Sequence, residues 1–261
     1  MKIAILTPTF NYYSGIDRVA QDEAELLSKE GHKVIVFTFE AKIKSKGYKV
    51  VELGRPIQFL ERFYRLFPFF YFNINLIKKL KDFDQIRGFN EPFEHIAVQA
   101  KKRYKIEYIA WFSGFYARGE NLLEKIYMNI FRYFYLKDLK QADKIICVSN
   151  FVRNKLIEKS DIPIKKTRVE YNHVDERRFN LNVRKLNLSK VNQIIEEYNL
   201  QNKKVFLYVG RLATSKRVDL LIKMFKMEKN EHSEYKLLIV GKPTFKSYFK
   251  KLLSMADEDI V

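Results

Sequence analysis

Residues 209–225 read VGRLATSKRVDLLIKMF, in which an apolar strand is followed by a glycine, two separated cations and an amphipathic helix. We predict that the strand, 206–209, is buried, and that Gly210 lets the chain turn tightly and lets a ligand approach the backbone. Arg211 offers a planar fork of donors and Lys216 a compact charge, which together suit two oxyanions of a diphosphate. The pattern predicts a phosphate site, although a solvated loop of any α/β protein can have the same local sequence.

The composition is that of a globular protein with an anionic partner. The 261 residues are 47% apolar, and 49 basic against 31 acidic residues give a net charge of +18. Nucleic acid, anionic lipid and a phosphate-rich substrate are all compatible with this charge. The basic residues do not form a tail, and there is no zinc-finger spacing, basic zipper or RNA-binding aromatic signature. We therefore do not expect nucleic acid as the partner.

Cysteine content and hydropathy limit the class of protein further. Cys147 is the single cysteine and lies in the apolar run 145–148, which predicts a small core residue and excludes a disulfide framework. The apolar run at the N-terminus is too short for a signal peptide, and no run of about 18 apolar residues exists. We expect a cytoplasmic protein, peripheral on the inner face of the membrane, and see no cluster of metal ligands.

The chain opens with the pattern of a βαβ unit. Residues 3–6 predict a strand, which is followed by a loop that ends at Ser14 and Gly15. A helical apolar pattern then runs to Gly31, a C-terminal cap, and 34–37 predict a second strand. We predict parallel strands, with Ser14 and Gly15 at the carboxyl edge of the sheet, where ligands bind in open α/β folds.

Further strands and one long helix follow. We predict strands at 50–51 and 106–111, and an amphipathic helix over 121–140. The side chains predicted to face inward from that helix are Ile126, Ile130, Phe134 and Leu139.

The segment 57–81 combines many aromatic residues with lysines and arginines. Aromatic rings beside cations can lie in a lipid interface, with the cations on anionic headgroups. Alternatively, the segment forms two core helices that are broken at Pro68. Both readings stay open on the sequence.

A strand over 142–149 ends in Ser149, which we predict to cap the helix that begins at Asn150. Another strand, 168–171, leads to 172–175, and the polar stretch that follows Phe179 and runs through Lys204 predicts an interdomain connection. A strand, helix, strand and helix then complete the chain.

Four segments in this order resemble glycosyltransferase family 4, the retaining GT-B enzymes that use nucleotide-sugar donors. They are Ser14-Gly15-Ile16-Asp17-Arg18, the strand 142–149, Asn172-His173-Val174-Asp175 with Phe179, and 209–225. The resemblance implies an α/β fold of GT-B type, with a complete N-terminal Rossmann-like, acceptor-side domain over 1–175 and the first part of a donor-binding domain over 176–261.

The same resemblance implies a function and a set of site residues. A sugar would pass, with retention, from a nucleoside diphosphate sugar to a glycan or lipid-linked acceptor. Arg211, Lys216, Gly210 and Gly15 would hold the donor diphosphate, and Ser14, Ser149 and Asn172 are further candidates for the site lining. Neither a metal nor another cofactor is implied, and no catalytic residue is identified.

The chain also departs from the family pattern. Family members often have a histidine near the sugar, but 111–114 read Trp-Phe-Ser-Gly, and His95 is expected to be a packed or solvated histidine. His173 stands where the family usually has glycine, and we do not expect it to be catalytic. The spaced pair of glutamates that forms the family's second donor signature does not occur, which suggests a C-terminally truncated or split enzyme.

Two other functions are a noncatalytic binding protein and a nucleotide-dependent oxidoreductase. The chain would instead be a noncatalytic remnant if its first domain only binds a membrane or a partner. Nucleotide-dependent oxidoreduction is disfavoured because no G-x-G-x-x-G follows the first strand.

Overall fold

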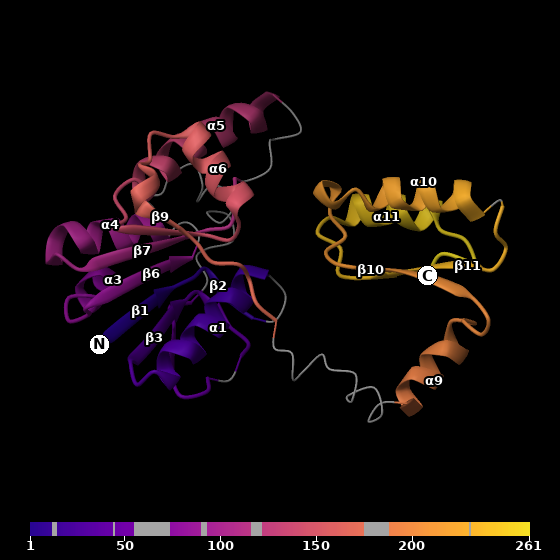
Figure 1. Cartoon of the computed structure of the whole chain (residues 1–261), viewed down its shortest axis with the longest axis horizontal. Coiled ribbons are helices and arrows are strands. Elements are labelled where there is room, and N and C mark those ends of the chain that lie inside the picture. The colour runs from indigo at the N-terminus through magenta and orange to yellow at the C-terminus, as the bar shows by residue number, and fades with distance from the viewer. Residues whose placement is uncertain are drawn as a thin grey trace. The chain divides into compact units, whose positions relative to one another are not determined.

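The protein consists of two compact units in a computed structural model. The structure describes residues 1–11, 15–43, 45–54, 74–89, 93–115, 122–174, 188–229 and 231–261. Contacts divide the chain into Met1–His173 and Val174–Val261, and each unit has its own hydrophobic core (Figure 1). The two units are described one after the other.

The N-terminal unit is built on a sheet of seven parallel strands. In spatial order these are β5 (Lys49–Glu52), β3 (Lys33–Thr38), β1 (Lys2–Leu6), β6 (Gln85–Phe89), β7 (Glu107–Phe112), β8 (Lys144–Cys147) and β9 (Thr167–Val169). Two short strands, β2 (Thr9–Phe10) and β4 (Glu40–Ala41), pair beside it. The predicted parallel arrangement of the first βαβ unit is confirmed.

Helices cover both faces of this sheet (Figure 1). Helix α1 (Gly15–Lys29) packs on the face formed by Ile3 and Ile5. On the other face, which Ala4 and Leu6 share, lie α3 (Ile74–Lys79), α4 (Phe93–Tyr104), α5 (Leu122–Leu139) and α6 (Asn150–Lys159). Because a parallel sheet is buried on both sides, its strands are nearly continuous apolar runs, and this is why most were visible in the sequence.

Three single-residue predictions are confirmed. Gly31 ends α1 in the left-handed region, at φ 85°. The N–H of Val152 donates to the Ser149 hydroxyl oxygen over 3.1 Å, so Ser149 caps α6. Cys147 is fully buried in the core, and this burial raises the pKa of its thiol to about 11.

Strand β6 was not predicted from the sequence. Its centre carries Arg87, which forms an ion pair with Glu23 of α1 and donates to the side-chain oxygen of Gln85 over 2.8 Å. The next residue is Gly88, where a Cβ atom would lie 3.0 Å from the ring of Tyr108. A charge and a glycine interrupt the apolar pattern, and only the packing around them shows why a central strand can hold both.

Helix α5 buries a different face from the one that the sequence predicted. Phe131, Tyr135 and Leu139 are 5%, 2% and 0% exposed, whereas Ile126 and Ile130 are 49% and 45% exposed. Leu139 therefore faces inward as predicted, but the inward positions of Ile126 and Ile130 are wrong. The rings of Phe131 and Tyr135 stack with centroids 6.1 Å apart, and large aromatic rings gain more from burial than isoleucine does.

The C-terminal unit holds a two-stranded parallel sheet with helices on one face (Figure 1). Its elements are α9 (Leu188–Glu197), β10 (Lys204–Val209), the 3₁₀ turn η3 (Thr214–Lys216), α10 (Val218–Lys229), β11 (Tyr235–Val240) and α11 (Lys246–Met255). Helix α9 lies within the stretch that the sequence predicted only as a polar connection, and none of its residues is buried.

The predicted burial of strand 206–209 is wrong. Val205, Leu207 and Val209 of β10 are 41%, 62% and 70% exposed. Phe206 is 44% exposed as well, although its ring centroid lies 6.0 Å from that of Phe225, and Tyr208 packs against the core under α10 and α11. Among the described residues, nothing covers the other face of this small sheet.

The segment 57–81 is only partly within the described residues. Residues 57–73 lie outside them. In the remainder, Leu76, Ile77 and Leu80 are at most 2% exposed, so this part belongs to the core. None of the helices that the structure describes is long and apolar enough to cross a membrane.

A pair of tyrosines two residues apart tests the orientation of α5. Tyr135→Ala should lower the free energy of unfolding by about 3–5 kcal/mol because it opens a cavity in the core. The matched control, Tyr133→Ala, should change it by less than about 0.5 kcal/mol because Tyr133 is 65% exposed. Urea unfolding followed by circular dichroism measures both, and equal losses would contradict this orientation.

Candidate donor-binding site

The order of the strands marks one position on the N-terminal sheet. Strands β3 and β5 lie on one side of β1, and β6 to β9 lie on the other, so the strand order reverses between β1 and β6. Open α/β sheets bind ligands outside the carboxyl ends of the strands at such a reversal. Gly15, the first residue of α1, follows β1 at this edge. It is exposed, and a Cβ atom at Gly15 would meet no atom within 4 Å.

Buried polar contacts hold the start of α1 in place. The hydroxyl of Thr9 donates to the buried carboxylate of Asp17 over 2.8 Å. The side-chain amide of Gln21 donates to the carbonyl oxygens of Asn11 (3.0 Å) and Asp17 (3.1 Å). A carboxylate in the first turn also suits the positive end of the helix. The sequence did not identify Asp17 and Gln21 as positioning residues. The feature that could have revealed them is a pair of polar residues on the inner face of an amphipathic helix.

The other candidates of this unit follow strand ends at the same edge. Ser149 follows β8, and its hydroxyl oxygen is engaged in capping α6. Asn172 follows β9 and is exposed. Ser14 lies outside the described residues. A parallel sheet brings these positions to one edge, but no contact joins Ser149 and Asn172 to Gly15 in the described parts of the chain, so their part in a site stays a prediction.

In the C-terminal unit, two glycines let two strand ends approach each other. The N–H of Gly210 donates to the carbonyl oxygen of Val240 over 3.0 Å. A Cβ atom at Gly241 would lie 1.7 Å from the carbonyl oxygen of Gly210, so only glycine fits there. The loops that follow are joined by Leu212 N–H to the Lys242 carbonyl (2.9 Å). In the sequence, Gly241 directly follows an apolar strand, as Gly210 does, and this position could have indicated its role.

The loop after Gly210 has a fixed backbone and two exposed cations. The hydroxyl of Tyr208 donates to the carbonyl oxygen of Arg211 over 3.0 Å, and Leu212 is 5% exposed. Lys216 ends η3, and its N–H donates to the carbonyl oxygen of Ala213 over 2.9 Å. No ion pair or side-chain hydrogen bond holds Arg211 or Lys216 among the described residues. Both cations are therefore available to an anionic ligand.

The first turn of α10 is tied to α11. Hydrogen bonds from Lys251 (2.8 Å) and the Tyr248 hydroxyl (2.9 Å) hold the carboxylate of Asp219. The hydrogen bond from Lys251 contributes most to lowering the pKa of Asp219 to about 2. Arg217, two residues before Asp219, has a left-handed backbone conformation (φ 52°). Its Nε atom lies 3.8 Å from Oδ1 of Asp219. These contacts fix the helix directly behind the loop that carries Lys216.

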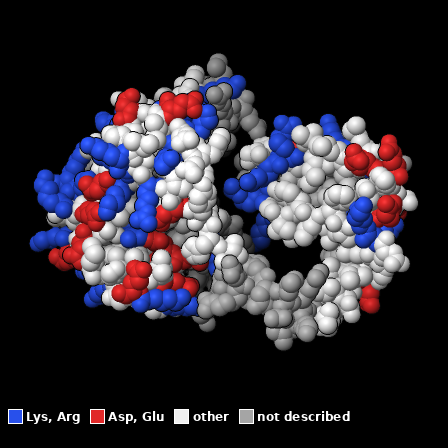
Figure 2. Space-filling view, viewed as in Figure 1, with Lys and Arg blue, Asp and Glu red and all other residues white. Residues whose placement is uncertain are grey.

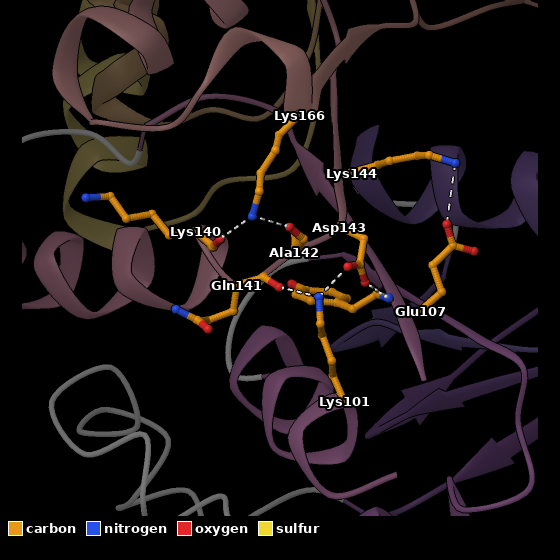
Figure 3. Close-up of polar contacts among 9 residues, drawn as sticks. Lys101, Glu107, Lys140, Gln141, Ala142, Asp143, Lys144 and Lys166 are labelled. Carbon is orange, nitrogen blue, oxygen red and sulfur yellow. Dashed lines mark hydrogen bonds and ion pairs between the residues drawn. The ribbon is translucent and has the colours of Figure 1, made fainter. Parts of the chain in front are cut away.

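The aspartate of the segment 142–149, Asp143, directly precedes β8 and so lies at the amino-terminal edge of the N-terminal sheet. Figure 3 shows its polar contacts. The carboxylate of Asp143 accepts hydrogen bonds from Lys101 Nζ (2.5 Å) and from the N–H of Tyr108 (2.9 Å). Burial raises the pKa of Asp143, but these hydrogen bonds outweigh it and lower the pKa. Lys166 Nζ donates to the carbonyl oxygens of Lys140 (2.9 Å) and Ala142 (3.0 Å), just after α5 ends. Asp143 thus joins α4 and β7 to the start of β8, and its role is structural.

The histidines are packed or form surface ion pairs. His95 Nδ1 lies 2.9 Å from Asp138 Oδ2, and both side chains are 13% exposed, as expected for a packed histidine. His173 Nε2 lies 3.7 Å from Asp22 Oδ2. Within the described ranges, no group of three or more His, Cys, Asp or Glu side chains is placed to hold a metal ion.

The fold and the matched segments define the class of protein as a glycosyltransferase of GT-B type. Residues 13–178 match the model of Glycosyltransferase Family 4, and residues 190–257 match that of Glycosyl transferases group 1. The first match covers more than half of the chain. The chain belongs to Glycosyltransferase Family 4.

Solved structures share this fold at low sequence identity. HepE from Anabaena in complex with UDP is 15% identical, with a TM-score of 0.69, over 98% of this chain and 65% of that chain. A glycosyltransferase from Rickettsia africae is 20% identical, with a TM-score of 0.65, over 97% and 64%. An α,α-trehalose-phosphate synthase from Burkholderia xenovorans is 12% identical, with a TM-score of 0.72, over 99% and 70%. The chain spans less than two thirds of the first two structures, and no curated protein matches it.

A pH series tests the contacts of Asp219. Asp219→Asn should lower the stability of the α10 and α11 region by about 1 kcal/mol at neutral pH, because it weakens exposed charge-assisted hydrogen bonds. The lowered pKa means that this stabilisation is present above the ordinary pKa near 3.8 and is lost as the pH falls through about 2. Pulsed hydrogen exchange of α10 and α11 peptides in a urea series measures the difference, and a gap that persists unchanged at pH 2 would contradict the assignment.

Proposed function

We propose that this chain is part of a glycosyltransferase that moves a sugar from a nucleoside diphosphate sugar to a glycan or lipid-linked acceptor with retention. The observation that carries the proposal is the loop with Arg211 and Lys216, whose backbone is fixed and whose cations have no counter-ion among the described residues. The complexes of HepE with UDP and with UDP-glucose support a nucleotide-sugar donor for this fold.

The residues suit the departure of a diphosphate. When the bond between the sugar and the diphosphate breaks, negative charge gathers on the leaving oxygens. Arg211 would bind two of these oxygens through its guanidinium, and Lys216 would add a point charge. Cations that are already in place stabilise this charge most in the transition state, so they accelerate the transfer as well as hold the donor. We propose no metal in this step.

Gly15 is the second proposed donor contact. It opens a helix of 15 residues, and the backbone N–H groups of such an end attract anionic and polar groups. The open space around its Cα lets a ligand approach the backbone. Ser149 and Asn172 are proposed as lining residues because they follow β8 and β9 at the same edge, and Ser14 because it directly precedes Gly15 in the sequence.

We also propose that the protein works at the inner face of the membrane as a peripheral protein. The net charge of +18 supports attraction to anionic lipids, and in the N-terminal unit Lys and Arg side chains are spread over the visible surface (Figure 2). The acceptor is proposed to be presented there.

One alternative is a noncatalytic member that binds a ligand without sugar transfer. The exposed apolar face of β10, to which a partner could bind, favours it. Transfer of radiolabelled sugar by the purified chain would contradict this alternative, whereas nucleotide binding with no transfer would support it.

Removal of the two cations tests the donor site. Arg211→Ala or Lys216→Ala should each weaken UDP binding by about 10- to 100-fold, because a charge-assisted hydrogen bond contributes about 1.5–3 kcal/mol. Isothermal titration with UDP, GDP and ADP measures the loss. The control carries Lys223→Ala and Lys250→Ala, two exposed lysines on the helices behind the loop, and should bind as the wild type does. Unchanged binding by the Arg211→Ala, Lys216→Ala double variant would refute the site.

Two glycines on one helix separate binding from folding. Gly15→Val should leave the melting temperature nearly unchanged, because the added atoms meet open space, but should weaken binding of the nucleotide sugar by at least about tenfold through a clash. Gly31→Ala should leave binding of the nucleotide sugar unchanged but lower the free energy of unfolding by about 1 kcal/mol, because alanine is strained at φ 85°. Thermal unfolding and titration with UDP-glucose give both readouts, and intact binding by Gly15→Val would remove Gly15 from the site.

A further inference from the structure

Helix α5 carries a second apolar stripe on the side away from the core. Ile126, Ile130 and Tyr133 are 49%, 45% and 65% exposed, and Lys137 is exposed in the next turn. Their spacing places them in one line along the helix. We call this line the α5 stripe. A surface helix of a globular protein normally has polar residues on this side, so the stripe needs a separate explanation.

A hollow lies beside the stripe, between α5 and α6. Its volume is about 680 Å³, and Tyr133, Leu136 and Lys137 of α5 line one side, with Ile157 and Ser160 near the end of α6 on the other. The apolar stripe therefore continues into a partly apolar depression. A flat lipid surface or a chain that enters the hollow could contact both.

Lysines outnumber acidic residues around the hollow, with Lys137, Lys140 and Lys159 against Glu158 and Asp161. Its two acidic residues are already neutralised, since Glu158 lies 2.7 Å from Lys155 and Asp161 lies 2.8 Å from Lys140. Lys137 has no ion pair within the described part of the chain, and Lys125, next to Ile126 in the sequence, is exposed. Exposed isoleucines and a tyrosine beside unneutralised lysines are the composition of an interfacial helix. The charge complements the headgroups of anionic lipids.

We infer that the α5 stripe and the adjoining hollow form the surface on which this protein docks on an anionic membrane. Ile126, Ile130 and the ring of Tyr133 enter the boundary between headgroups and acyl chains, and Lys125 and Lys137 contact lipid phosphates. This inference rests on the membrane association in the proposed function and assigns it to a surface. It does not depend on the donor site.

Vesicle sedimentation with the full chain tests the surface. The vesicles are phosphatidylcholine with and without phosphatidylglycerol, and the variants are Lys125→Ala with Lys137→Ala, and Ile126→Ser with Ile130→Ser. The lysine pair should weaken binding to the anionic vesicles by about fivefold for each lysine, and added salt should weaken wild-type binding. The isoleucine pair should weaken binding to a similar degree because it removes buried apolar area.

The matched control lies on the opposite face of the sheet. Leu26, which is 50% exposed, and Lys29 are both on α1, so Leu26→Ser with Lys29→Ala removes the same kinds of side chain elsewhere. Its vesicle binding should equal that of the wild type. If the α5 variants bind anionic vesicles as tightly as this control, the α5 assignment is wrong although membrane association stands. If the wild type binds neither kind of vesicle, both the membrane association and its assignment to the α5 stripe are wrong. UDP titration still reports separately on the donor site.

A fluorescence measurement places the stripe directly. Tyr133→Trp adds an indole to the stripe, and the native Trp111 is 5% exposed in the core on the α1 side, where it stacks on Phe89. Brominated lipids should quench the added indole and leave Trp111 unchanged. If the protein sediments with the vesicles but the added indole is not quenched, the inference is wrong. Another surface would then bind the membrane, and the α5 stripe would bind a protein partner.

Discussion

The pairing of β1 with β3 on one side and β6 on the other is the constraint on which the N-terminal unit depends. All seven strands are parallel, so their carboxyl ends meet at one edge and their amino ends at the other. Gly15 follows β1 at the first edge, whereas Asp143 precedes β8 at the second. Residues from two family-like segments thus lie at different edges: Gly15 is exposed at the edge where open α/β folds bind ligands, and Asp143 holds α4, β7 and β8 together.

In the C-terminal unit the corresponding constraint is the contact between Gly210 and Gly241. The missing side chain at Gly241 lets the end of β11 approach the carbonyl oxygen of Gly210, and backbone hydrogen bonds then hold the following loops. The side chains of Arg211 and Lys216 make no hydrogen bond or ion pair to described residues. A rigid backbone with uncommitted cations is what binding of a multiply charged ligand requires, because little conformational freedom is lost on binding.

Much of the fold could be predicted because parallel strands are buried on both faces. The runs at 3–6 and 34–37 are apolar throughout, and 106–111 is apolar except for Glu107; all three were identified as strands, and Gly31 and Ser149 were identified as helix caps. Strand β6 was missed because Arg87 interrupts its apolar run, and the pattern cannot show that Glu23 neutralises that charge. The donor loop was proposed from its residue types, but the positioning roles of Asp17, Gln21 and Gly241 were identified only from contacts in the folded chain.

The sequence by itself therefore determined the α/β class, the main strands, the family and the cations of the donor loop, since each depends on local pattern or residue type. Tertiary structure alone decided which side of a helix or strand is buried. Helix α5 has apolar residues on two sides, and packing of Phe131 and Tyr135 leaves Ile126 and Ile130 outside. Strand β10 is apolar on both faces, yet α10 and α11 cover one of them. A repeating apolar pattern limits which faces can be buried, and burial is settled by the neighbours that pack against each face.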